Sequence, residues 1–186
     1  QIAKLVKLKI GPWIGREAIK FVGKQIRRTS TGVEIWHDEK YLTGILEELG
    51  LNEKSRPLGT LSLDAHPMNH EEKLKWDRPL PEEMHYTYRR IIGKLRYMVP
   101  ERYDMCYAVQ RLSKEMATPT LSSWARLKKV GRYLLGTVNW KTVLQPSTGS
   151  LRLQVWTDSD HAGDKETRRS TSSAVLLLNN AMVSSY

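Results

Sequence analysis

The stretch 86-YTYRRIIGKLRYMV-99 decides how the middle of this 186-residue chain folds. Its apolar residues recur three and four positions apart, the spacing that places side chains on one side of an amphipathic α-helix. Pro100 ends the pattern, because proline cannot continue a helix. The opposite side carries four basic residues: Arg89, Arg90, Lys94 and Arg96. A helix of this kind needs neighbouring segments to cover its apolar side.

Two further amphipathic helices are expected directly after it. The first has Asp104 as its candidate N-cap and an apolar stripe from Met105 to Met116. The next follows Thr118-Pro119-Thr120 and ends at Gly136. Its outward side also carries four basic residues: Arg126, Lys128, Lys129 and Arg132. Three short helices this close in sequence should pack together.

The first 50 residues predict strands followed by a helix. Alternating apolar residues indicate strands over 4–10, 18–26 and 32–36, and a turn at Thr29–Gly32 makes a hairpin of the last two. After Asp38, apolar residues return to helical spacing until Gly50. The prolines and acidic excess that follow predict an irregular linker.

Residues 146–186 predict about three strands. Leu151–Thr157 alternates, and Ser172–Leu178 and Ala181–Tyr186 flank Asn179-Asn180, a candidate hairpin turn. Three acidic residues follow the first strand: Asp158, Asp160 and Asp164. Carboxylates where a strand leaves a sheet are suitable ligands for Mg²⁺. The local pattern alone favours turn residues that hydrogen-bond their own backbone.

These patterns predict an α+β fold in four parts. A β-hairpin and a helix occupy residues 1–50, an acidic linker 51–85, three basic helices 86–145, and an incomplete sheet 146–186. The sheet is incomplete because few residues follow the acidic cluster, so we interpret the chain as a segment of a larger enzyme.

The net charge of +10 is concentrated in one block of the chain. Residues 86–141 carry twelve Lys/Arg against three Asp/Glu. Such a block attracts polyanions, which makes nucleic acid the first partner to consider. A basic helix face that is merely solvated is the open alternative.

The cysteine count and hydropathy exclude several classes of protein. Cys106 is the single cysteine, so an intrachain disulfide is excluded, and its apolar helical setting predicts a buried thiol. No apolar run approaches the roughly 18–20 residues of a membrane span. We expect an intracellular protein, cytoplasmic or nuclear, with no membrane partner and no small-molecule cofactor.

Five groups of residues carry a family resemblance. In chain order they are Phe21-Val22-Gly23 with Lys40-Tyr41, Tyr88-Arg89 with Ile92-Gly93, Arg102-Tyr103-Asp104 with Leu112-Ser113, Trp124-Ala125 with Arg132–Thr137, and Asp158–Asp164 with Arg168–Ser172. Together they resemble the Pol polyprotein of Ty1/copia-type retrotransposons, in its reverse transcriptase and ribonuclease H (RNase H) region. The resemblance covers residues 21–172.

The resemblance implies a role for each part. Phe21, Val22 and Gly23 would belong to a hairpin that positions the primer at the end of the polymerase palm. The basic helices would form the thumb and connection that grip an RNA–DNA hybrid by its shape. Asp158 would be the first metal-binding carboxylate of RNase H, with Asp160 as a second candidate. Mg²⁺ would be the cofactor of the complete parent, and the rest of the polyprotein a partner.

The chain also departs from the family pattern. The polymerase Tyr-X-Asp-Asp motif does not occur in it, and the later RNase H carboxylates would lie beyond Tyr186. We therefore expect a segment that binds a hybrid or another duplex but is inactive alone, which leaves its status as an enzyme open. The alternatives are a non-enzymatic DNA-binding module that uses the helices of residues 86–136, and a protein-interaction segment with a solvated basic face.

Overall fold

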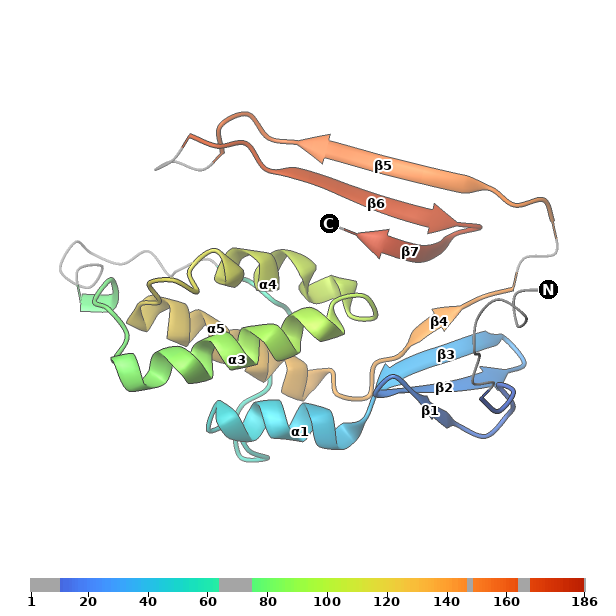
Figure 1. Cartoon of the computed structure of the whole chain (residues 1–186), viewed down its shortest axis with the longest axis horizontal. Coiled ribbons are helices and arrows are strands. Elements are labelled where there is room, and N and C mark those ends of the chain that lie inside the picture. Colours follow the sequence, from blue (N-terminus) through green and yellow to red (C-terminus); the bar gives the residue numbers. More distant parts are fainter. Residues whose placement is uncertain (1–10, 64–74, 147–148, 164–167, 186) are drawn as a thin grey trace, which may run out of the picture.

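The computed structural model describes residues 11–63, 75–146, 149–163 and 168–185, and these form an α+β fold (Figure 1). The predicted strand at residues 4–10 lies outside this range. The helices are α1 (Glu39–Glu48), α3 (Glu82–Met98), α4 (Cys106–Ser113) and α5 (Leu121–Gly136), with a 3₁₀ turn, η2 (Tyr103–Met105), before α4. The strands are β1 (Ile19–Phe21), β2 (Lys24–Thr29), β3 (Gly32–His37), β4 (Thr142–Leu144), β5 (Leu153–Ser159), β6 (Ser172–Leu178) and β7 (Ala181–Ser185).

The helix predicted from residues 86–99 is confirmed as α3, and it supplies the largest share of the buried core. Its fully buried residues are Tyr88, Ile91, Ile92, Leu95 and Met98. They pack with buried side chains of α1, α4 and α5 in one cluster. Fully burying a side chain such as Leu or Ile contributes roughly 1.5–3 kcal/mol, so this shared core accounts for the packing of the predicted helices against one another.

Side chains cap the starts of two helices, α1 and α5. Asp38 caps α1 by accepting a hydrogen bond from the Lys40 amide at 3.0 Å. Thr120 and Ser123 form a reciprocal capping box at the start of α5. The prediction that Asp104 caps the second helix is wrong, because α4 has no side-chain cap.

The Asp104 carboxylate has a different role. It accepts a hydrogen bond from the Arg102 guanidinium at 2.8 Å and another from the Tyr133 hydroxyl at 2.8 Å. Arg102 is only 5% exposed, and a buried cation requires a counter-ion. Asp104 therefore pairs with Arg102 and does not cap the helix.

The first sheet has the strand order β1-β2-β3-β4 and is antiparallel throughout. The predicted turn at Thr29–Gly32 is confirmed, since these residues pair at the end of β2 and β3. The single strand predicted over residues 18–26 is wrong. Val22 and Gly23 both have positive φ, 47° and 73°, and their turn divides the segment into β1 and β2.

Strand β4 brings the chain back to the first sheet after the helices. Leu144 pairs with Val33, and Thr142 with Ile35. The sequence analysis did not predict β4, because three residues are too few to show an alternating pattern. Residues 51–63 form no helix or strand, and the Leu58 amide in this segment donates to the Arg132 carbonyl of α5 at 3.0 Å.

The second sheet has the order β5-β6-β7 and confirms the strands predicted near the C-terminal acidic cluster. Asn179 and Asn180 form the predicted hairpin turn, with φ angles of 49° and 67°. Asparagine tolerates this left-handed backbone better than most residues. Figure 1 shows this sheet above α4 and the first sheet at one end of the helical core, and β7 contacts β4.

Candidate functional site

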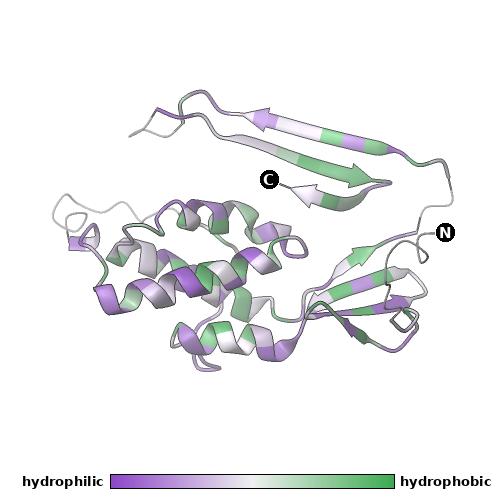
Figure 2. Ribbon diagram, viewed as in Figure 1, coloured by the Kyte–Doolittle hydropathy of each residue, from purple (hydrophilic) through white to green (hydrophobic). Residues whose placement is uncertain are grey.

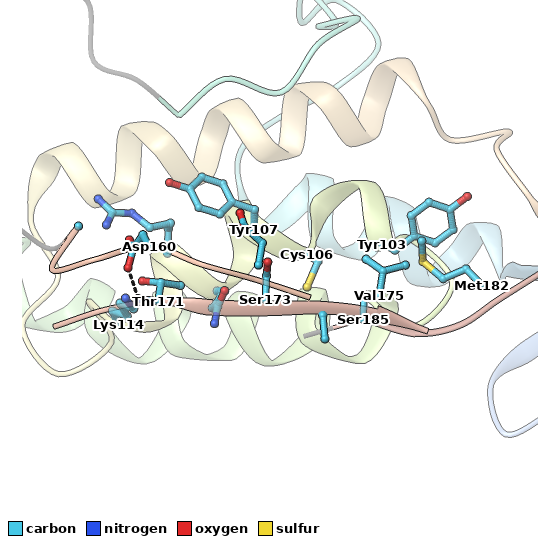
Figure 3. A pocket seen from close by; sticks show the side chains of 15 residues that line it. Tyr103, Cys106, Tyr107, Lys114, Asp160, Thr171, Ser173, Val175, Met182 and Ser185 are labelled. Atoms are coloured by element: carbon cyan, nitrogen blue, oxygen red, sulfur yellow. Dashed lines mark hydrogen bonds between the residues drawn. The ribbon is translucent and has the colours of Figure 1, made fainter. Parts of the chain in front are cut away.

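A cleft of about 470 Å³ separates α4 from the second sheet (Figure 3). One wall is formed by η2, α4 and the residue that follows α4, and the other by β5, β6, β7 and the loop between β5 and β6. Asp158 and Asp160 both line the sheet wall. Asp158 and Asp160 therefore face an open space that a ligand can enter, whereas Asp164 lies outside the described residues.

Asp158 and Asp160 have different surroundings within the cleft. Asp158 lies in β5 opposite Ser173 of β6, is exposed, and makes no hydrogen bond or ion pair with the described residues. Asp160 is bound to Thr171: its amide donates to the Thr171 carbonyl at 3.0 Å, and its carboxylate accepts from the Thr171 amide. Asp160 therefore bonds the backbone of Thr171, eleven residues away, and not its own turn as the local pattern favoured.

The described residues offer few ligands for Mg²⁺. Within them, no group of three or more His, Cys, Asp or Glu side chains is placed to hold a metal ion. Asp158 offers one carboxylate without a partner in the described part of the chain, and Asp160 is already engaged. Mg²⁺ is commonly held by one or two carboxylates together with water and substrate phosphates. A complete protein site for this ion does not fit the residues present.

The predicted basic residues of α3 divide into two pairs. Arg90 and Lys94 form ion pairs with Glu48 of α1 at 3.0 and 2.6 Å. Burial raises the pKa of Glu48, but the contacts with Lys94 and Arg90 more than offset this and hold the pKa below its ordinary value. Arg89 and Arg96 are exposed and make no side-chain bond within the described residues.

The predicted basic residues of α5 do not face those of α3. Arg126 forms an ion pair with Glu115, which follows α4, at 2.8 Å. Arg132 donates to the Arg56 carbonyl in the segment 51–63 at 2.6 Å. The two remaining residues, Lys128 and Lys129, are half-buried. The eight predicted cations therefore lie on several sides of the helical core, and at least four are engaged within the chain.

The predicted primer-positioning residues lie at the end of β1 and in the turn that follows it. Phe21 and Val22 are exposed, and the Tyr97 hydroxyl of α3 donates to the Val22 carbonyl. A side chain at Gly23 would place a Cβ 2.8 Å from the Tyr97 hydroxyl oxygen. The turn is thus held against α3 while its two apolar side chains face solvent.

Glu101 joins three strands of the first sheet to the helical core. Its carboxylate lies 2.6 Å from Lys24 Nζ and 3.2 Å from His37 Nε2, and its carbonyl accepts a hydrogen bond from Thr142 at 2.5 Å. Burial raises the pKa of Glu101, while contacts with His37 and Lys24 lower it to a net value below the ordinary one. This carboxylate is therefore ionised and structural at neutral pH.

The sequence analysis did not single out the cleft-lining residues of η2, of α4 and of the position after α4. They include Tyr103, Tyr107, Arg111 and Lys114. The signal was present, because these positions are four, four and three residues apart and so lie opposite the buried stripe. Cys106 also lines the cleft and is half-buried, so the prediction of a buried thiol is wrong.

No helix in the described ranges has the length and apolar character needed to cross a membrane. Neither a family model nor a solved structure matches the chain.

Curated proteins do match the chain over most of its length. It is 31% identical over 164 residues to the retrovirus-related Pol polyprotein from transposon RE1 of Arabidopsis thaliana, which covers 88% of this chain and 11% of that protein. It is 28% identical over 176 residues to the retrovirus-related Pol polyprotein from transposon TNT 1-94 of Nicotiana tabacum, covering 90% of this chain and 12% of that protein. An uncharacterized mitochondrial protein of Arabidopsis thaliana, AtMg00810, is 32% identical over 154 residues, covering 81% of this chain and 59% of that protein.

Two of these relatives are transposon-encoded polyproteins, which defines the class of protein to which the chain is similar. The chain belongs to the family of retrovirus-related Pol polyproteins from copia-type transposons. It spans 11 to 12% of the length of the Pol polyproteins that it matches.

Proposed function

We propose that this chain is part of the reverse transcriptase and RNase H region of a copia-type Pol polyprotein, and that it binds nucleic acid. The observation that carries the proposal is the match to the RE1 polyprotein over 88% of the chain. The order of elements supports it: a hairpin and helix, a helical core, and a strand that ends beside Asp158.

Electrostatics supports nucleic acid as the partner. The chain has a net charge of +10, and cations attract a phosphate backbone through release of its counter-ions. Arg89 and Arg96 on α3 are exposed and available for such contacts. The partner proposed from the resemblance is an RNA–DNA hybrid, which proteins recognise largely by shape and backbone.

Asp158 is proposed as one ligand of a Mg²⁺ ion in the whole polyprotein. Bound Mg²⁺ would neutralise phosphate charge and activate water in RNase H chemistry. The described residues supply too few ligands for that chemistry, so we expect this chain to bind nucleic acid without cleaving it.

Fluorescence anisotropy with a labelled 20-base-pair RNA–DNA hybrid tests the proposal. For about four phosphate contacts, affinity should fall roughly 100-fold between 50 and 200 mM salt. Incubation of the same hybrid with Mg²⁺ should leave the RNA strand intact. Absence of binding, or binding that ignores salt, would contradict the proposal.

The same assay separates the alternative of a sequence-specific DNA-binding module. Such a module needs a recognition helix that reads base edges in the major groove. Equal affinity for two DNA duplexes of unrelated sequence would exclude it, whereas a preference of 1000-fold or more would favour it over the hybrid-binding segment.

A further inference from the structure

One side of η2 and α4 carries two tyrosines and two cations in a single stripe. Tyr103, Tyr107, Arg111 and Lys114, here called the α4 stripe, follow one another at helical spacing. The opposite side of the same helix is buried in the core through Ala108, Val109 and Leu112. Eleven residues of helix rise about 16 Å, so the stripe is long enough to contact several nucleotides.

The aromatic members of the α4 stripe are accessible. Tyr103 is 44% exposed and Tyr107 is 67% exposed. Neither ring makes a ring–ring or cation–π contact within the described part of the chain. Flat rings left open in this way can stack on other planar groups.

The cations of the α4 stripe also differ from the ion-paired cations on α3 and α5. Arg111 and Lys114 form no ion pair within the described residues, in contrast to Lys94 and Arg126, which are held by Glu48 and Glu115. A cation without an internal counter-ion can bind an external anion without first breaking a salt bridge. Figure 3 shows Lys114 at one end of the cleft and Tyr103 at the other.

We propose that the α4 stripe binds single-stranded nucleic acid, with bases stacked on Tyr103 and Tyr107 and phosphates bound by Arg111 and Lys114. This inference rests on the proposed function and assigns it a site that the sequence analysis did not single out. Tyrosines flanked by cations are the usual means of binding single strands, because the bases of a duplex are not free to stack on side chains.

The opposite wall determines how the strand lies. Asp158 and Asp160 repel phosphate, so the sugar–phosphate backbone lies along α4 and not along β5. The cleft volume of about 470 Å³ is in the range that holds a small ligand. A strand therefore occupies the cleft with roughly one or two nucleotides and continues along the exposed stripe.

Binding of a labelled 12-residue oligodeoxythymidine to the full chain, without divalent metal, tests the inference. The double variant Arg111→Gln with Lys114→Gln should lower affinity at least tenfold and reduce the salt slope by about 1.4, the value for two single-strand phosphate contacts. Tyr107→Ala should lower affinity about tenfold through lost stacking.

Matched controls remove the same groups elsewhere. Arg28→Gln with Lys40→Gln also removes two exposed cations, and Tyr86→Ala removes an exposed tyrosine of α3. These variants should change affinity for the oligonucleotide less than about twofold, since surface changes away from a contact have small effects. If they weaken binding as much as the α4 variants do, the assignment to α4 is overturned.

Cys106 provides a second measurement, because it is the single cysteine and lines the same cleft. Saturating oligonucleotide should slow its reaction with a thiol reagent severalfold, and unchanged reactivity would overturn the inference. If the unmodified chain binds neither the oligonucleotide nor the hybrid, the proposed function is contradicted as well. If it binds the hybrid but the α4 variants leave its affinity for the oligonucleotide unchanged, only the inference about the α4 stripe is overturned.

Discussion

The first sheet, β1–β4, is anchored to the helical core, whereas the second sheet, β5–β7, is supported mainly by its own strand pairing. Glu101 contacts β2, β3 and β4, and Tyr97 bonds the turn between β1 and β2. Among the described residues, Ala174 is the one buried apolar residue of β5–β7 and β1–β4 have none, so the sheets differ in their polar contacts with the core. Both sheets are antiparallel, so backbone pairing alone does not explain the difference.

Both sheets expose apolar side chains, and the second sheet exposes more of them. Leu153, Val155 and Trp156 of β5 are each more than half exposed, and Val183 of β7 is 54% exposed. Figure 2 shows β6 as the most continuously hydrophobic strand of this sheet. Apolar sheet surface is stabilised when another layer covers it. The comparison indicates that contacts with the helical core, more than strand pairing, determine which of the two sheets is more stable.

The largest expected effect comes from Leu95→Ala in the helical core. Leu95 is fully buried, and removing such a side chain costs roughly 2–5 kcal/mol in the free energy of unfolding. Denaturant titration measures the loss. Hydrogen exchange should accelerate in β1–β4 and change little in β5–β7; equal acceleration in both sheets would break the comparison.

Glu101→Gln should have the next largest effect and lower the free energy of unfolding by roughly 1–3 kcal/mol, because it leaves the half-buried Lys24 without its counter-ion. The folded-state pKa of Glu101 lies below its ordinary value of 4.5, so its contribution is present above that pH. The contribution is lost as the pH falls through the lowered folded-state value. Denaturant midpoints across this range should therefore fall more steeply for the native chain than for the variant. Glu53→Gln, an exposed carboxylate, is the control and should have a small effect.

Val22→Asn should stabilise the first sheet by roughly 1 kcal/mol. Val22 has a φ of 47°, and left-handed backbone costs a β-branched residue about 1–2 kcal/mol. Asn-Gly is the preferred pair for this type of hairpin turn. The bond from Tyr97 goes to the backbone of Val22 and is retained. A thermal midpoint equal to or below that of the native chain would contradict this account of the turn.

The smallest effect is expected for Val155→Thr in the second sheet. Val155 is 53% exposed, and threonine keeps its β-branched shape, so the free energy of unfolding should change by less than about 0.5 kcal/mol. Ile35→Thr in β3 is the matched substitution in the first sheet, where Ile35 lines a small hollow with Leu42 and Met98. It should cost roughly 1–2 kcal/mol. Similar costs for both would remove the distinction between the two sheets.

Sequence patterns predicted the long elements but failed at two short ones. The Asn179-Asn180 turn was predicted because asparagine favours left-handed backbone, whereas Val22-Gly23 was missed because valine rarely adopts it. Strand β4 was missed because its pairing with β3 involves residues more than a hundred positions away. Local patterns contain no information about such pairings.

The candidate site was only partly predictable. Asp158 was found from its position at a strand end, and it does line a cleft. The sequence could not reveal that Glu48 engages Arg90 and Lys94, because these partners are more than 40 residues apart in the chain. Counting charges therefore overestimated how many cations of α3 and α5 remain available.

The sequence by itself determined the α+β composition, the buried sides of the helices and the membership of the copia-type Pol family, because periodicity and motif order are local or linear properties. The tertiary structure decided which charges are paired, that Asp160 bonds Thr171 while Asp158 stays open, and that α4 faces the second sheet. Those outcomes depend on distances between segments far apart in the chain, and packing alone sets such distances.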